Sequence, residues 1–295
     1  MSAFHAGERA IQQRAGFGDA VLSVGERFIR GALPEQHQAF FAQLPFVLLG
    51  VLDAQGVPRA GLLTGAPGFM SAVDDAHLEW QGDGLVGEGL AGCFAPGAQL
   101  GLLGIEAHTR RRNRANGVIV GAGDGRVRMR VTQSFGNCPK YIHPRRADLS
   151  PLTGTPRVMQ GWDEAARRIV AAADTFYIAT AHPEAANQAA PAHGVDVSHR
   201  GGEAGFVEVI GNTLSVLDYP GNRFFNTLGN LELNPQAGLL FIDYTSQSLL
   251  QLAVRAQIDW LPAPDEAPTR PGRMLRFEVV SAERTEGGLP LVWTD

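Results

Sequence analysis

Residues 238–243 read GLLFID, and residues 101–106, which lie 137 positions earlier, read GLLGIE. The same offset relates a second pair of segments, residues 64–70 (TGAPGFM) and residues 201–207 (GGEAGFV). Two separated blocks in one register are not expected by chance, and they indicate an internal duplication. The sequence therefore predicts two copies of one structural unit within a single chain.

The residues around these blocks read mainly as short apolar strands separated by turns. Helical patterns occur in residues 1–43, and again in residues 150–173, where a helix follows a stretch rich in Pro, Gly and Thr. A unit of about six short strands and one helix suits a small barrel. We expect a mainly β fold with flanking helices, in which two tandem barrels, residues 44–149 and 174–295, pack as a pseudo-dimer.

Composition excludes several classes of protein. The chain has 295 residues, of which 44% are hydrophobic, and a formal net charge of -5, so it can fold around a sizeable core. This charge balance does not favour nucleic-acid binding, and the longest apolar run, residues 44–52, is too short to span a membrane. Because Cys93 and Cys138 are the only cysteines, no disulfide framework is expected. We expect a cytoplasmic protein.

The duplication allows one copy to be compared with the other. Residues 198–200 read Ser-His-Arg, whereas residues 61–63, at the same offset, read Gly-Leu-Leu. The second copy therefore carries a hydroxyl, an imidazole and a guanidinium where the first copy is apolar. This asymmetry makes the second copy the candidate for a binding site.

A second polar segment follows in the same copy. Residues 218–223 read DYPGNR and lead into a predicted helix whose first turn includes residues 226 and 227. Cations, hydroxyls and amides around a helix start can bind a dianion such as a phosphate ester, with about 1.5–3 kcal/mol for each charge-assisted hydrogen bond. The candidate binding residues of this copy are Ser198, His199, Arg200, Asn222, Arg223, Asn226 and Thr227.

These segments in combination resemble the pyridoxamine 5'-phosphate oxidase-related, FMN-binding split-barrel proteins. The resemblance rests on residues 196–202 (DVSHRGG), 205–207 (GFV), 218–223 (DYPGNR), 226–231 (NTLGNL) and 238–243 (GLLFID). Residues 133–142 (QSFGNCPKYI) resemble one two-barrel branch of that superfamily. The match covers most of residues 44–260, and it implies two tandem Greek-key split β-barrels.

The resemblance further implies FMN at the seam between the two barrels, with its phosphate held by the second barrel. Arg200 and the residues around the helix start would face that phosphate. Lys140, the only lysine, would lie near the pyrimidine edge of the flavin and stabilise the reduced ring, and Tyr141 would cap the ring or fill the core. The implied activity is that of an oxidoreductase, which exchanges a hydride or electrons with a small substrate or a nicotinamide donor.

Other interpretations remain open. The C-terminus lacks the Arg/His motif of true pyridoxamine phosphate oxidases, so that substrate is not expected. The same fold could hold flavin without turnover, or haem, for which His199 would be the first ligand to test. Residues 110–114 (RRRNR) could complete a shared site, because alternation along a strand would direct two or three of their side chains at one ligand, but a solvated hairpin tip is the interpretation we favour. The histidines show no metal-binding spacing, so no metal is expected. One principal site per chain is expected if the halves pair internally, and two per homodimer if whole chains pair.

Overall fold

The computed structural model describes residues 2–90, 92–152, 154–187, 190–262 and 272–294. The strands of the first large sheet are β1 (Phe46–Leu52), β2 (Pro58–Thr64), β3 (Met70–Ala72), β4 (His77–Gln81), β5 (Leu85–Val86), β6 (Gln99–Glu106), β7 (Arg111–Gly123) and β8 (Arg126–Gly136). Those of the second are β10 (Arg157–Gln160), β11 (Thr175–Ala181), β12 (Val195–Gly201), β13 (Glu208–Ile210), β14 (Thr213–Leu217), β15 (Gln236–Asp243), β16 (Ser248–Trp260) and β17 (Arg273–Glu286). The helices are α1 (Ala6–Arg14), α2 (Gly18–Phe28), α3 (Glu35–Ala42), α4 (Glu164–Ala172) and α5 (Asn226–Leu233).

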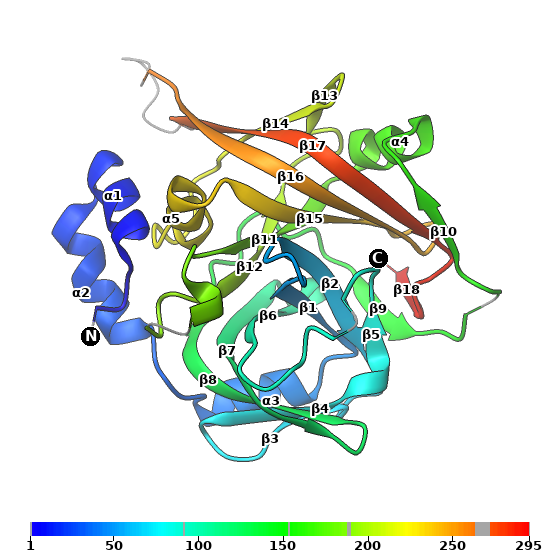
Figure 1. Cartoon of the computed structure of the whole chain (residues 1–295), viewed down its shortest axis with the longest axis horizontal. Coiled ribbons are helices and arrows are strands. Elements are labelled where there is room, and N and C mark those ends of the chain that lie inside the picture. Colours follow the sequence, from blue (N-terminus) through cyan, green and yellow to red (C-terminus); the bar gives the residue numbers. More distant parts are fainter. Residues whose placement is uncertain (1, 91, 153, 188–189, 263–271, 295) are drawn as a thin grey trace.

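Seven strands of each large sheet have the same topology, while β5 is added at one end of the first sheet and β10 pairs beside the second. The first has the strand order β3-β4-β8-β7-β6-β1-β2-β5, and the second has the order β12-β11-β15-β16-β17-β14-β13, with β10 paired to β17 outside this path. The bounds of strands β12, β15 and β16 repeat those of β2, β6 and β7 at the offset of the duplicated blocks. Each sheet curls into a split barrel, and the two barrels lie against each other (Figure 1). The predicted mainly β fold of two duplicated split barrels is confirmed.

Each barrel has its own hydrophobic core, and a third apolar cluster joins them. Trp80 is fully buried in the first core and Phe241 in the second. The joining cluster takes equivalent residues from both halves, among them Leu103 and Leu240. Since these two positions are related by the same offset, the barrels pack through the same face, as in a twofold dimer.

The strands at this interface approach each other closely. β6 of the first barrel contacts β12 of the second, and β15 of the second contacts β2 of the first. A Cβ atom added at Gly101 would lie 2.6 Å from the carbonyl oxygen of Val195, and one added at Gly238 would lie 2.6 Å from that of Pro58. Both pairs obey the offset of the duplication, so two equivalent glycines bring the backbones of the two barrels together.

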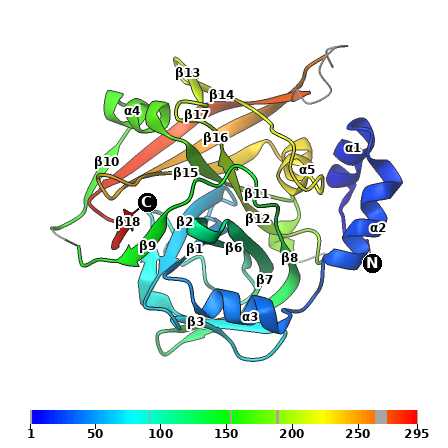
Figure 2. The ribbon, with the colours of Figure 1, turned by 180° about the vertical axis from the view of Figure 1, so that it is seen from behind.

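The N-terminal helices divide between the two barrels. Helices α1 and α2 lie beside α5 of the second barrel, whereas α3 lies against the first barrel (Figures 1 and 2). The side chain of Glu8 on α1 accepts a hydrogen bond from the side-chain amide of Asn226 at the start of α5. Burial, followed by the charge of Asp196, raises the pKa of Glu8 well above its usual range. The helices predicted in residues 1–43 are therefore present, and α1 is held against α5.

The end of the chain returns to the first half. Strand β18 (Leu291–Thr294) pairs antiparallel with β9 (Arg146–Leu149), which follows the first large sheet in the sequence. Figure 2 shows this small sheet beside the interface between the barrels. Among the described residues, no helix is long and apolar enough to cross a membrane.

Candidate functional site

A cavity of about 380 Å³ lies at the seam between the two barrels. Its walls come from β7 of the first barrel, from β12 and the start of α5 in the second, and from the connection between β14 and α5. This volume is within the range of small-molecule sites. Seven of the residues predicted from the sequence line it: Ser198, His199, Arg200, Asn222, Arg223, Asn226 and Thr227.

Arginines dominate the charge of the cavity. Five arginines line it, and Asp218 is the only carboxylate among its described lining residues. The arginines are Arg112, Arg114, Arg200, Arg223 and Arg273. Because the side chains converge from both barrels, the seam concentrates positive charge in a chain whose formal net charge is -5. Such a cavity favours an anionic ligand.

Asp218 positions two of these arginines. Arg200 donates from Nη1 to one carboxylate oxygen of Asp218 at 2.8 Å, and Arg273 donates from Nε to the other at 2.9 Å. Asp218 is only 3% exposed. Arg200 Nε is buried without a hydrogen-bond partner. One carboxylate therefore holds two guanidinium groups at the cavity while it compensates only one of their charges.

Two further arginines enter from β7. Side chains alternate along a strand, and Arg112 and Arg114 line the cavity whereas Arg111 is exposed. Arg112 Nε is buried without a partner, and burial, together with the neighbouring Arg114 and Arg200, lowers the pKa of Arg112 to about 10. The prediction that residues 110–114 form a solvated hairpin tip is wrong for Arg112 and Arg114, because β7 begins at Arg111 and turns alternate side chains inward.

Arg114 also joins the two barrels. It donates to Asp196 Oδ1 at 2.5 Å and to the carbonyl oxygen of Val197 at 2.9 Å. Asp196 accepts two more hydrogen bonds, from the side-chain amides of Asn116 at 2.7 Å and Asn230 at 3.1 Å. This buried, paired carboxylate compensates Arg114, so Arg112 is the β7 arginine whose charge remains available to a ligand.

The start of α5 forms the polar end of the cavity. The hydroxyl of Thr227 donates to that of Ser198 at 3.0 Å. Phe225, the residue that precedes α5, provides no side-chain cap. The first amides of a helix have no partner within the helix and carry partial positive charge. Two hydroxyls and the first turn of α5 therefore add hydrogen-bonding groups beside the arginines.

The connection before α5 is held in an unusual backbone conformation. Arg223 and Phe225 have φ angles of 66° and 61°, in a region that residues other than glycine rarely adopt. Asn222 Oδ1 accepts from the amide of Phe224 at 3.1 Å, which stabilises this turn. The Arg223 guanidinium lies 4.4 Å from the centre of the Phe17 ring. Arg223 is exposed, so it lies at the rim of the cavity.

His199, Lys140 and Tyr141 differ in how they lie relative to the cavity. His199 is 8% exposed, and burial, then the charge of Arg112, lowers the pKa of His199 well below its usual range. Lys140 and Tyr141 line a neighbouring hollow instead of the seam cavity, and both are exposed. The ring of Tyr141 stacks on that of Tyr219 with a centroid distance of 5.1 Å, and Tyr219 lines both hollows. Tyr141 therefore approaches the cavity only through Tyr219.

Several cavity residues were not predicted from the sequence. Arg112 and Arg114 belong to the arginine run, for which strand alternation allowed two or three side chains at one ligand, but the solvated hairpin tip was the favoured interpretation. Arg273 lies 55 residues beyond Asp218 in the sequence, and no local motif connects them. Phe17 comes from the segment between α1 and α2, and its place over Arg223 follows only from the docking of these helices on α5.

Comparisons with solved structures find split-barrel proteins at low similarity. HupZ from Group A Streptococcus matches with a TM-score of 0.31 and 11% identity, over 41% of this chain and 92% of its own. An FAD-binding protein from Mesorhizobium loti matches with a TM-score of 0.30 and 11% identity, over 44% and 97%. HutZ, a haem storage protein from Vibrio cholerae, matches with a TM-score of 0.29 and 14% identity, over 42% and 94%.

Pyridoxamine 5'-phosphate oxidase-like proteins and an F420 reductase also occur among these structural neighbours. No protein-family model and no curated protein sequence matches the chain. At these identities and TM-scores the neighbours do not assign a ligand or an activity to this chain. The functional argument therefore depends on the cavity itself.

Proposed function

We propose that this chain binds FMN in the seam cavity and acts as a cytoplasmic FMN-dependent oxidoreductase, whose partner is a small molecule or a nicotinamide donor. The observation that carries the proposal is the set of five arginines and one carboxylate around a cavity of about 380 Å³ between two split barrels. A flavin mononucleotide combines an anionic tail with a flat aromatic ring, and both ends need a suitable environment.

The second barrel suits the phosphate. Arg200 and Arg273 are held together by Asp218 at 2.8 and 2.9 Å, and the hydroxyls of Ser198 and Thr227 lie beside the first turn of α5. Arg200 Nε is a buried donor that lacks an acceptor, and a phosphate oxygen would supply one. Each charge-assisted hydrogen bond of this kind contributes about 1.5–3 kcal/mol.

The rest of the cavity suits the ring. Leu103, Pro220 and Phe225 provide apolar wall, and Arg112 faces the cavity from the first barrel. With a pKa of about 10, Arg112 is charged at neutral pH and would stabilise an anionic reduced ring, the role that the sequence suggested for Lys140. When bound, FMN supplies hydride or electron transfer, while the protein binds the phosphate, orients the ring and provides positive charge.

The decisive experiment is the visible absorbance spectrum of freshly purified protein, followed by cofactor release and quantification. We expect flavin bands and about one FMN per chain. The variant Arg200→Leu reproduces Leu63 of the first half and should weaken FMN binding at least tenfold, because it removes a charge-assisted contact. Arg255→Leu replaces an exposed arginine of the same barrel and should bind as the parent does. Equal FMN content in Arg200→Leu and parent would overturn the phosphate assignment.

The same spectrum tests the alternatives that the sequence left open. A Soret band would indicate haem, and the buried His199 at the cavity wall would then be replaced first. Flavin that is bound but is not reduced by NADH or NADPH, and does not turn over after reduction by dithionite, would identify a flavin-binding module without catalysis.

A further inference from the structure

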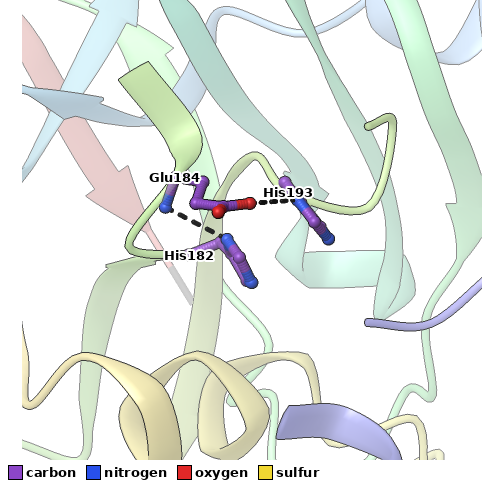
Figure 3. A group of neighbouring side chains, drawn as sticks. All are labelled: His182, Glu184 and His193. Atoms are coloured by element: carbon purple, nitrogen blue, oxygen red, sulfur yellow. Dashed lines mark hydrogen bonds and ion pairs between the residues drawn. The ribbon is translucent and has the colours of Figure 1, made fainter. Parts of the chain in front are cut away.

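A cluster of potential metal ligands lies away from the seam cavity, in the loop that connects β11 to β12. His182, Glu184 and His193 each offer one donor atom, and these atoms all lie within 4.8 Å of one another. His193 Nδ1 is 3.1 Å from a carboxylate oxygen of Glu184. Figure 3 shows the carboxylate of Glu184 directed at His193, with the rings of His182 and His193 side by side below it.

A third imidazole lies beside this cluster. The ring centroid of His5, in the N-terminal segment, is 4.9 Å from that of His182 and 6.4 Å from that of His193. His5 is 4% exposed, and its Nε2 makes no hydrogen bond, although a carboxylate oxygen of Glu8 lies 3.5 Å away. Burial, then the charge of His182, lowers the pKa of His5 to about 4.

The first barrel has no counterpart of this cluster. Its equivalent connection, between β1 and β2, is a short turn in which the carboxylate of Asp53 accepts from the amides of Gln55 and Val57. In the second barrel the connection from β11 to β12 is longer, and its described parts are residues 182–187 and 190–194. His193 Nδ1 is itself buried and makes no hydrogen bond, although a carboxylate oxygen of Glu184 lies 3.1 Å away, and a bound ion is one cause of such an atom in a native structure.

We infer that His182, Glu184 and His193 bind a divalent transition-metal ion of the zinc class, next to His5. Two imidazoles and a carboxylate are a typical zinc ligand set, whereas magnesium and calcium prefer sites made of oxygen alone. The histidine ligands are separated by a loop, and for this reason their spacing in the sequence gave no signal.

Binding requires a local rearrangement. The rings of His182 and His193 are stacked, with centroids 3.9 Å apart and an angle of 12° between their planes. A metal ion lies near the plane of each imidazole that binds it, so the two rings must rotate out of the stack. His182 Nδ1 also accepts from the amide of Glu184 at 3.1 Å. The rearrangement gives up the stacking contact, the contact between His193 and Glu184 and, where the ion takes His182 Nδ1, the hydrogen bond from the amide of Glu184.

The position of the ion indicates a structural role. His5 precedes α1, which packs on α5 beside the seam cavity. An ion in the cluster would stiffen the β11–β12 loop at the place where the N-terminal segment lies against the second barrel. The inference does not depend on flavin, because none of these three ligands lines the seam cavity.

The test uses the full chain, freed of metal with a chelator and titrated with zinc chloride by calorimetry. We expect one zinc ion per chain. His193→Ala and Glu184→Gln should each weaken binding at least tenfold, and His108→Ala, which replaces an exposed histidine, should leave it unchanged. The absence of zinc binding by the parent, or parental affinity in both cluster variants, would overturn the inference.

Two further measurements separate ligand loss from misfolding and from the flavin site. Zinc should raise the melting temperature of the parent and of His108→Ala, and should not raise that of His193→Ala, since an ion stabilises only the state that binds it. Glu184 is exposed, so Glu184→Gln should retain the parental circular dichroism spectrum and remain informative if His193→Ala does not fold. The FMN content of all samples should be the same, so that a failure here leaves the proposed flavin site untouched.

Discussion

The two halves of the chain meet at two equivalent seams, and the structure uses them differently. At the seam that holds the cavity, the hydroxyl of Thr227 contacts that of Ser198 at 3.0 Å. At the other seam, the positions equivalent by the duplication are Leu90 and Gly61, and they lie against each other. A Cβ atom added at Gly61 would be 2.2 Å from Leu90 Cδ1, and Leu90 is fully buried. A side chain of the protein therefore fills the second seam.

The hydrogen bonds across the two seams follow the same symmetry. Arg114 donates to the carbonyl oxygen of Val197 at 2.9 Å, and Gln251, its counterpart, donates to that of Ala60 at 2.9 Å. The scaffold thus keeps one backbone contact at both seams while the side chain that makes it changes from charged to neutral. The comparison teaches that the seam between two copies of this barrel can hold either a ligand cavity or a packed leucine. The charged side chains occur at the seam that holds the cavity.

The largest effect is expected when the charged seam is given the side chain of the neutral one. Arg114→Gln copies Gln251 and leaves the carboxylate of Asp196, which is 7% exposed, with only the amides of Asn116 and Asn230 as donors. Removing one partner of a buried ion pair costs about 3–5 kcal/mol. Urea unfolding followed by circular dichroism should show a loss of this size.

The matched control removes the stranded charge as well. The double variant Arg114→Gln with Asp196→Asn should recover part of the lost stability, because no uncompensated carboxylate remains. A single variant that loses less than about 1 kcal/mol would mean that the pair behaves as an exposed ion pair, and the proposed difference between the seams would disappear.

The second effect concerns the side chain that fills the neutral seam. Leu90→Ala should cost about 2–5 kcal/mol, since it leaves a cavity in a packed core. Thr227→Ala, at the equivalent position, removes one hydroxyl contact and should cost about 1 kcal/mol. Unfolding curves for the two variants give the comparison directly. Equal losses of unfolding free energy in Leu90→Ala and Thr227→Ala would contradict the description of one seam as filled and the other as a cavity.

The fold was predictable because its signal is repeated. The short apolar segments expected to form strands include β1, β4 and β6, and the offset shared by two separate blocks predicted the duplication. Strands and turns are indicated by alternating apolar residues and by turn residues. These patterns involve neighbouring residues only, so they can be recognised in a single sequence. The short strands β9 and β18 were not predicted, because two four-residue segments, one at the end of the first half and one at the end of the second, carry no periodic signal.

The cavity was only partly predictable. The contrast between copies selected Arg200 and its neighbours, which line the seam, because residues close in the sequence on one strand and one helix start are also close in space. The contrast between the copies could not select Arg273, which is held at the cavity by its ion pair with Asp218. The family resemblance, and not this contrast, favoured Lys140, but the chain after β8 carries Lys140 into the neighbouring hollow.

The smallest effect tests whether the two halves really pack as a symmetric pair. Gly101 faces the carbonyl oxygen of Val195 and Gly238 faces that of Pro58, both at 2.6 Å from an added Cβ. Since backbone atoms cannot move aside as a flexible side chain can, Gly101→Ala and Gly238→Ala should each destabilise the protein by about 1–3 kcal/mol, and by similar amounts. Gly123→Ala is the control, because a Cβ there meets nothing within 4 Å. Urea midpoints that fall for only one of the two interface variants would show that one seam bears the packing alone, and the pseudo-twofold description would then fail even though the strand order repeats.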